Sequence, residues 1–275
     1  MNFRTLLLPL ALLTTAALHA DPVKVRYQEG TVRGFLVLEN MAGDEIAIGD
    51  ETQNVRGGIL RGHLVYHFKD GSLDDDTVTY TQRGGVFHLL TDHHIQHGPS
   101  FPHPQDVTIN TATNTVTSRI SKDGKPELKS THVDMPPDLY NGMIQTVIKN
   151  LRANSPETKF SYLINGDKPR IIHFAVTPHE EDPFTIAGAP RHATHFVIKV
   201  ELGGIEGVVA PIVGKKPEDI HIWIAEDGAP AFVREQGQMF EGGPVWRMHQ
   251  TSPVFPAHAD TKADRKEEKK EDKKP

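Results

Sequence analysis

Histidine and aspartate side chains crowd one stretch of the chain, and these residue types hold metal ions or move protons. The densest run is Asp-His-His-Ile-Gln-His at positions 92–97. In a β-strand, His93 and His97 lie on one face while Asp92 and His94 lie on the other, because side chains alternate. The run alone therefore cannot form a three-histidine site.

Pairing with the preceding strands offers a better grouping. Residues 59–68, 72–82 and 86–97 predict three strands, turning at Asp-Gly 70–71 and Gly-Gly 84–85. In that meander Asp75 lies between Val65 and His94, because paired strands are about 4.8 Å apart. His63 and His67 lie diagonally on the same face, with Asp92 nearby.

A carboxylate among imidazoles suits zinc or proton transfer. We therefore predict a zinc site of four residues: His63, His67, Asp75 and His94. The alternative is an ordinary polar sheet face in contact with solvent. The grouping depends on the register, because a shift of one residue moves a strand's side chains to the opposite face.

Other catalytic patterns are missing from the sequence. The chain has no cysteine, which excludes thiol catalysis, and it has no His-Glu-x-x-His, Gly-x-Ser-x-Gly or phosphate-loop motif. We therefore assign no catalytic residue and no cofactor beyond zinc. These absences favour a protein that is not an enzyme.

Strand patterns continue through the second half of the chain. Residues 160–164 end at an Asn-Gly turn, and residues 170–176 and 194–202 alternate apolar with polar side chains. Ile220, Ile222 and Ile224 share a face around Trp223. The fold class that we predict is mainly β (α+β), a large curved antiparallel sheet or half-barrel.

One amphipathic helix is expected, over residues 138–152. Pro136 and Pro137 precede it, where the missing N–H costs nothing. Its apolar side chains recur at helical spacing and must pack on the sheet: Leu139, Tyr140, Met143, Ile144, Val147, Ile148 and Leu151. We expect this helix on the concave face.

The ends of the chain differ in composition from the body. Residues 1–20 read as a signal peptide, with Arg4 before an apolar run that is too short to span a bilayer at about 20 residues. Residues 21–256 form one β-rich domain, and residues 257–275 form a charged tail without large apolar side chains, typical of disorder. We expect an exported protein, periplasmic or secreted, without a transmembrane segment.

The net charge of −6 argues against binding to nucleic acid, which requires clustered positive charge. No protein partner can be predicted from the sequence.

Several motifs carry a family resemblance. The segments 68–76, 92–102, 135–143 and 240–246 resemble an uncharacterised family of secreted bacterial proteins that brings no established activity. Residues 222–230 are more distantly similar to envelope proteins with lipoprotein-carrier-like folds. That second resemblance implies a curved antiparallel sheet that wraps around helices and shelters an apolar cavity.

The leading functional hypothesis is binding or carriage of an apolar ligand, such as a lipid or acyl chain. Its expected lining is Met143, Ile144, Phe196, Ile198 and Trp223, residues that core packing explains equally well. The glycine-rich segment 203–214 is either a buried strand or short helix with turns, or a mobile flap over the ligand cavity. The alternatives are a metal-dependent or acid–base hydrolase using the histidines and aspartates of the meander, and an envelope protein–protein interaction module.

Overall fold

The computed structural model describes residues 22–122, 125–166, 168–201 and 217–255, without the side chains of residues 120–126. The predicted signal peptide, the charged tail and the glycine-rich segment 203–214 lie outside these residues.

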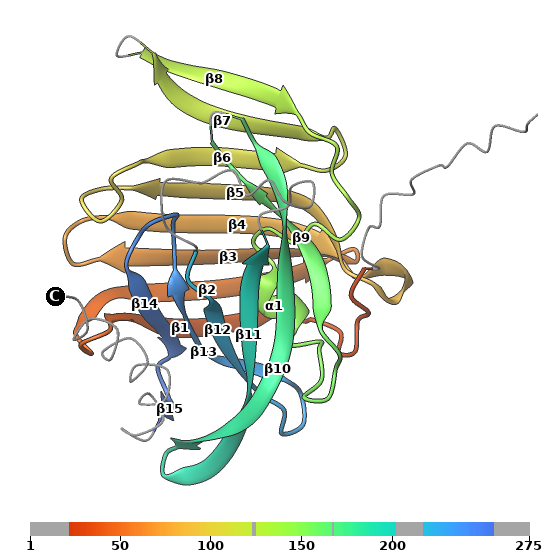
Figure 1. Cartoon of the computed structure of the whole chain (residues 1–275), viewed down its shortest axis with the longest axis vertical. Coiled ribbons are helices and arrows are strands. Elements are labelled where there is room, and N and C mark those ends of the chain that lie inside the picture. The colour runs from red at the N-terminus through yellow and green to blue at the C-terminus, as the bar shows by residue number, and fades with distance from the viewer. Residues whose placement is uncertain (1–21, 123–124, 167, 202–216, 256–275) are drawn as a thin grey trace, which may run out of the picture.

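A single antiparallel sheet contains every strand of the described residues (Figure 1). Neighbouring strands follow the order β15-β10-β11-β12-β13-β14-β1-β2-β3-β4-β5-β6-β7-β8, and β9 pairs with β10. The strands are β1 Val32–Asn40, β2 Glu45–Arg56, β3 Ile59–Phe68, β4 Leu73–Thr81, β5 His88–His97, β6 Gln105–Asn110, β7 Thr115–Lys122, β8 Lys125–His132, β9 Thr158–Ile164, β10 Arg170–Ile186, β11 Ala189–Glu201, β12 Ile220–Ala225, β13 Ala231–Gln238, β14 Val245–Gln250 and β15 Pro253–Val254.

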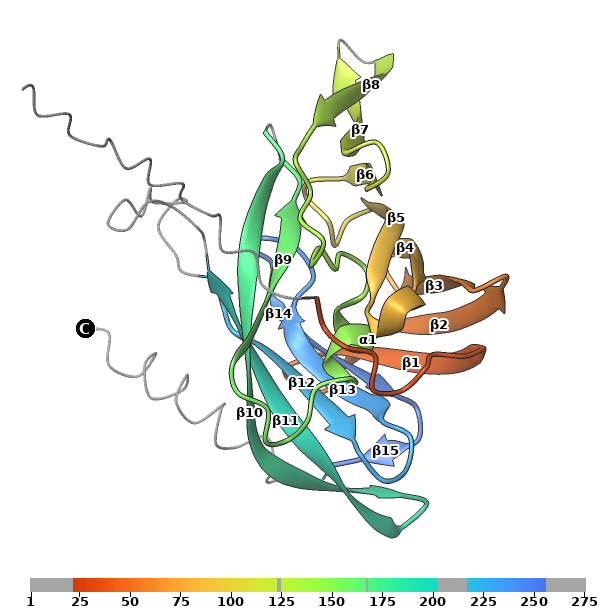
Figure 2. The ribbon, with the colours of Figure 1, turned by 90° about the vertical axis from the view of Figure 1, so that its right-hand side faces the viewer.

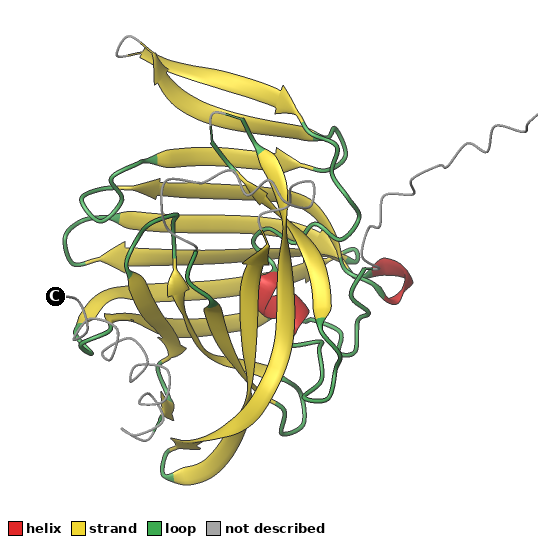
Figure 3. Ribbon diagram, viewed as in Figure 1, coloured by secondary structure: helices red, strands yellow, loops and turns green. Residues whose placement is uncertain are grey.

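The sheet bends into two facing walls (Figure 2). One wall contains β9 to β13 and the other contains β1 to β6, while the short helix α1 (Ile144–Ile148) lies between them (Figures 2 and 3). This arrangement confirms the predicted fold class, a mainly β protein with a curved antiparallel sheet and a helix on its concave face.

The predicted central meander is also confirmed. Strands β3, β4 and β5 begin and end within two residues of the expected ranges. Gly71 adopts a φ of +86° in the first turn, which explains why the Asp-Gly pair is needed there. The Asp70 carboxylate accepts a hydrogen bond from the Ser72 backbone N–H at 2.8 Å and so closes that turn.

The predicted helix over residues 138–152 is wrong in its extent. Only five residues are helical, and Gly142 precedes them with a φ of +67° that no α-helix accommodates. Before that glycine, Leu139 forms a parallel bridge with Ser161 of β9 instead. The apolar stripe is nevertheless buried, because turns carry the same side chains into the core; Leu139, Tyr140, Met143, Val147, Ile148 and Leu151 are all at most 7 % exposed.

The edge of β9 is closed by the segment before α1. The Tyr140 N–H donates to the Ser161 carbonyl at 3.1 Å, and the Asn141 side chain then bonds both backbone groups of Leu163. An unpaired edge would expose backbone groups to other chains. The Asn141 amide therefore makes the two hydrogen bonds to Leu163 that a neighbouring strand would otherwise make.

The space between the two walls is filled mainly by aromatic and aliphatic side chains. Those that are almost completely buried include Tyr66, Tyr80, Tyr140, Phe87, Phe101, Phe160, Phe196, Leu36, Leu38, Leu60 and Leu139. A smaller apolar cluster, formed by Phe184, Ala193, Trp223 and Val233, packs on the other face of β10 to β13. No helix among the described residues is long and apolar enough to cross a membrane.

Candidate functional site

Polar side chains interrupt the apolar packing on the concave face of β3 to β6. Register places them in two adjacent rows across the strands: Tyr66, Asp74, Gln96 and Gln105 in one, and Leu64, Asp76, His94 and Val107 in the next. Direct partners on neighbouring antiparallel strands lie about 4.5–5.5 Å apart. The rows therefore bring Asp74, Asp76 and His94 into one neighbourhood.

Asp74 and His94 form a bonded pair within this neighbourhood. The His94 Nε2 lies 2.7 Å from Asp74 Oδ1, and Asp74 is only 4 % exposed. Burial opposes the charge on His94, but the hydrogen bond to Asp74 and the charges of Asp74, Asp76 and Asp75 raise its pKa to about 8. The second ring nitrogen, Nδ1, faces the Gln105 amide at 3.4 Å. Asp74 thus fixes the ring while Nδ1 points toward Gln105.

Asp76 and Asp92 form a carboxyl pair beside His94. Burial raises the pKa of Asp76 well above its usual range, and the nearby charge of Asp92 raises it further. Burial also raises the pKa of Asp92, to about 6. Two carboxyls in such contact cannot both ionise without a large cost, so the pair holds a proton at acidic to neutral pH.

Gly142 covers this carboxyl pair from the segment before α1. A Cβ at this position would lie 2.7 Å from Asp92 Oδ1 and 3.2 Å from Asp76 Oδ2. Glycine is therefore required both by the positive φ and by the close approach of the backbone to the carboxyls.

The opposite wall contributes Glu235 from β13. Burial raises its pKa to about 7, partly offset by a hydrogen bond that the Gln145 amide donates at 3.0 Å. Burial raises the pKa of Tyr162 on β9. The nearby charges of Asp92, Asp76, Asp74 and Glu235 raise it further. We call Asp74, Asp76, Asp92 and Glu235 the interior carboxyl cluster.

Some buried oxygen atoms of this region have no hydrogen-bond partner. They are the Tyr66 hydroxyl, Asp76 Oδ1 and Asp92 Oδ1. Solvent nevertheless reaches the region, because Asp76, His94, Tyr162 and Glu235 are half-buried rather than buried. Unpaired buried polar atoms reduce folding stability by about 1–3 kcal/mol each, so packing of the core alone does not explain why these polar side chains lie here.

A cleft of about 440 Å³ borders this region of the sheet. It lies between β6 to β8 and the turn that joins β9 to β10, where Ser118 Oγ and Asn165 Oδ1 are 3.0 Å apart. Gln105 lines the cleft and donates its amide to Gln96 Oε1 at 2.7 Å. Gln96 in turn donates to Asp74 Oδ1 at 2.8 Å. A chain of amides therefore connects the cleft with the Asp74–His94 pair.

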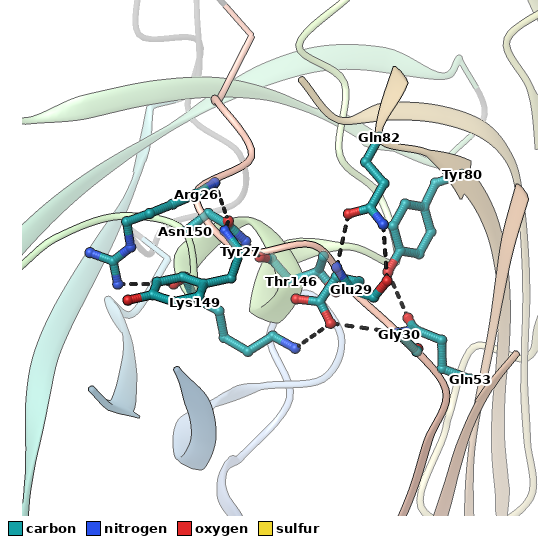
Figure 4. Close-up of polar contacts among 10 residues, drawn as sticks. All are labelled: Arg26, Tyr27, Glu29, Gly30, Gln53, Tyr80, Gln82, Thr146, Lys149 and Asn150. Carbon is teal, nitrogen blue, oxygen red and sulfur yellow. Dashed lines mark hydrogen bonds and ion pairs between the residues drawn. The ribbon is translucent and has the colours of Figure 1, made fainter. Parts of the chain in front are cut away.

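A second hollow, of about 460 Å³, lies beside the N-terminal segment and is lined by Arg26, Tyr27, Arg152, Ala153, Asn154 and Glu226. The polar network next to it binds the N-terminal segment to the turn after α1 (Figure 4). Lys149 Nζ contacts Glu29 Oε2 at 2.9 Å, and Asn150 Oδ1 accepts from the Arg26 and Tyr27 N–H groups. These contacts hold α1 in place against the N-terminal segment.

An aromatic and imidazole stack lies on the outer face of β11 to β13. His195 stacks on Trp223 at 4.5 Å between ring centroids, and the Arg234 guanidinium lies over the indole ring at 3.9 Å from its centroid. Burial and the charges of His221, His179 and Arg234 lower the pKa of His195 to about 3. His195 is therefore neutral at physiological pH.

The structure divides the predicted zinc ligands between the two faces of the sheet. The expected pairing of Val65 with Asp75 is present, and His63 Nε2 lies 3.0 Å from Asp75 Oδ1 on the outer face, which also carries the exposed His67. However, Asp75 pairs with Ile95, and His94 pairs with Asp76. The expected β4–β5 register was wrong by one residue, so His94 lies on the concave face.

Among the described residues, no group of three or more histidine, aspartate and glutamate side chains has a metal-binding arrangement.

The predicted apolar lining is also divided. Met143, Phe196 and Ile198 belong to the filled core between the walls, and Ile144 packs against it. Trp223 pairs with His195 and packs in the outer cluster. None of the five residues lines either of the two hollows described above.

Sequence analysis placed Asp92 near the predicted site but missed the other inward-facing carboxyls. Asp74 and Asp76 flank the predicted Asp75, so the alternation of β4 could have revealed them once the register was known. Glu235 carries no comparable signal, because it comes from a strand far along the chain and meets the others only in the folded structure.

Comparison with known proteins gives little further information. No protein-family model matches the chain, and no curated protein matches it. Among solved structures, it is similar to a "Beta-barrel-like Protein of Domain of Unknown Function DUF1849" from Brucella abortus. The TM-score is 0.45 and the identity 8 %, over 84 % of this chain and 100 % of that chain. A likeness this distant carries no argument about activity.

Proposed function

We propose that the protein performs acid–base chemistry on a small polar molecule that enters through the 440 Å³ cleft. The observation that carries this proposal is the Asp74–His94 pair, bonded at 2.7 Å, whose Nδ1 contacts the amide of Gln105, a residue of the cleft wall, at 3.4 Å. Clefts of this size with a few convergent polar groups and shifted pKa values are typical of active sites.

The chemistry follows from the two ring nitrogens. Asp74 accepts a hydrogen bond from Nε2 of His94. His94, with a pKa of about 8, can therefore lose and regain a proton at Nδ1. Near neutral pH His94 is therefore the proton donor, and the neighbouring Asp76–Asp92 pair, in which the pKa of Asp92 is about 6, can accept a proton. One donor and one acceptor with separated pKa values are the minimum for general acid–base hydrolysis.

A matched pair of variants tests this proposal. His94→Gln removes the inner imidazole, whereas His63→Gln removes an imidazole of the same kind from the outer face, where it contacts Asp75 at 3.0 Å. Both are assayed with the wild type on chromogenic esters, amides, phosphate esters and glycosides. We expect one class to be hydrolysed by the wild type and His63→Gln, and about 100-fold or more slowly by His94→Gln. Equal rates for all three proteins on every class would refute the proposal.

Two proposals from the sequence are weaker. Carriage of a lipid or acyl chain has the filled core against it, and its test is lipid extraction of the purified protein followed by mass spectrometry. A role as an interaction module has the exposed Phe35 and Ile48 of β1 and β2 in its favour, at 55 % and 56 % exposure.

We also propose export, on the sequence of residues 1–20 alone. The N-terminal sequence of the protein recovered from the cell envelope tests this, and a start at Asp21 is expected.

A further inference from the structure

The hollow beside the N-terminal segment contains more positive than negative charge. Its volume is about 460 Å³, and its lining includes two arginines, Arg26 and Arg152, and a single acid, Glu226. The lining therefore has a net charge of +1 at neutral pH. Lys149 does not belong to the lining and is held by Glu29 at 2.9 Å. This excess of positive charge favours an anionic ligand.

The Arg26 guanidinium is held by long contacts. Its Nη2 lies 3.5 Å from the Lys149 carbonyl oxygen, a contact that Figure 4 shows, and 3.6 Å from Glu226 Oε2. Hydrogen bonds between a charged nitrogen and a charged oxygen are usually about 2.7–2.9 Å long. The guanidinium also lies over the Tyr27 ring, 4.9 Å from its centroid. Arg26 thus lines the hollow without a short ion pair of its own.

Arg152 lines the same hollow from the turn after α1. Its backbone is fixed, because its N–H donates to Ser155 Oγ at 2.9 Å and its carbonyl accepts from the Ser155 N–H at 2.9 Å. Its side chain is exposed, and its guanidinium forms no hydrogen bond or ion pair with any residue that the structure describes. Paired N–H groups of a guanidinium match the two oxygens of a carboxylate. Arg152 is therefore available to a ligand.

The backbone that carries Arg26 is ordered as well. Asn150 Oδ1 accepts hydrogen bonds from the N–H groups of Arg26 and Tyr27 at 2.7 and 2.9 Å. The Asn150 amide in turn donates to the Thr146 carbonyl of α1 at 2.9 Å. Both arginines therefore extend from backbone that is already held in place, which reduces the conformational entropy lost when a ligand binds.

We infer that this hollow binds the carboxylate of a small organic acid between Arg26 and Arg152. One carboxylate neutralises the net charge of the lining, and Tyr27 and Asn154 add a hydroxyl and an amide that can donate to the same ligand. Hollows of this size hold small molecules. A phosphate dianion fits less well, because Glu226 remains in the lining and repels a second negative charge.

This site is additional to the one in the proposed function. The two hollows share no lining residue, so either proposal can fail while the other stands.

The probe is benzoate, with benzamide as an uncharged control of the same shape. Both are titrated into the full chain at pH 7 and about 20 mM salt, where screening is weak, and binding is followed by saturation-transfer NMR. We expect saturable binding of benzoate with a Kd of about 5 mM or below, and binding of benzamide that is at least about tenfold weaker. Raising the salt concentration to about 200 mM should weaken benzoate binding, because the salt screens the ion pairs.

Variants of opposite charge should act in opposite directions. Arg152→Gln should weaken benzoate binding about fivefold or more, whereas Arg61→Gln, which removes an exposed guanidinium from β3, should leave it unchanged. Glu226→Gln should strengthen it about threefold or more, because the variant removes the carboxylate that contacts Arg26 at 3.6 Å.

Three results would overturn the inference. They are no saturable binding of benzoate up to about 20 mM, equal binding of benzamide, and equal affinity of Arg152→Gln and the wild type for benzoate. Tighter binding of inorganic phosphate than of benzoate would refute the choice of a carboxylate. If Arg152→Gln does not fold, Glu226→Gln decides, and weaker benzoate binding by that variant would count against the site.

Discussion

Replacing Glu235 by glutamine should stabilise the protein at alkaline pH, and this is an unusual outcome for a change in a buried side chain. Glu235 is half-buried on β13 and accepts a hydrogen bond from the Gln145 amide at 3.0 Å. Burial raises its pKa from 4.5 to about 7. Glutamine has the same size and removes only the charge.

The sign and size of the change in unfolding free energy follow from proton linkage. A carboxyl whose pKa is raised in the folded state holds its proton more tightly there than in the unfolded chain. Its contribution to stability is complete below pH 4.5 and is lost as the pH rises through about 7. A shift of about two to three pH units corresponds to about 3 kcal/mol, at about 1.4 kcal/mol per unit. The variant avoids this loss.

The assay is urea unfolding followed by tryptophan fluorescence, at half-unit steps from pH 4.5 to 8.5. The difference in unfolding free energy between Glu235→Gln and the wild type should grow by up to about 3 kcal/mol in favour of the variant. Glu45→Gln is the control, because Glu45 is an exposed side chain paired with Lys69 at 3.1 Å. A constant difference across the range, or a growing advantage of the wild type, would refute the electrostatic reasoning.

Three further predictions concern the surroundings of the site. Gly142→Ala should destabilise the fold by about 1–3 kcal/mol more than Gly84→Ala in urea unfolding. Both glycines have φ near +67°, but only Gly142 lies against carboxyls. Equal losses of stability in the two variants would contradict the close approach of Gly142 to the carboxyls. Asn141→Ala should cost about 2–4 kcal/mol in the same assay by leaving both Leu163 backbone groups unpaired, and a loss below 1 kcal/mol would show that water replaces the amide. Folding stability should fall as the pH decreases from 6.5 to about 3, because His195 stays neutral in the folded protein but is protonated in the unfolded chain. His195→Phe should reduce this loss of stability at acidic pH. An unchanged pH dependence in the variant would exclude His195 as its source.

The sequence predicted the fold more completely than the site. Two-residue alternation located β3, β4, β5 and the inward faces of β11 and β12, because a half-buried sheet imposes that period on the chain. The apolar stripe from Leu139 to Leu151 was also buried as expected. Its helical spacing predicted a helix over the whole stripe, but pairing of Leu139 with β9 and the positive φ of Gly142 limit the helix to five residues.

The site could be predicted only in part, because it depends on register. Placing Asp75 opposite His94 rather than opposite Ile95 is a difference of one residue, and it moves His94 to the other face of the sheet. A bulge between Thr79 and Tyr80 changes the count along β4 and β5, and no residue type announces it. Glu235 enters the site from a distant strand, which local patterns cannot show.

The central claim is that burial in the concave face raises the pKa values of its carboxyls toward the neutral range, where they can exchange protons. The most direct measurement is a pH titration of the side-chain carboxyl ¹³C signals by NMR, with Asp92→Asn and Glu235→Gln used for assignment. We expect midpoints of about 6 for Asp92 and about 7 for Glu235. Midpoints near the ordinary value of about 4 for both groups would contradict it.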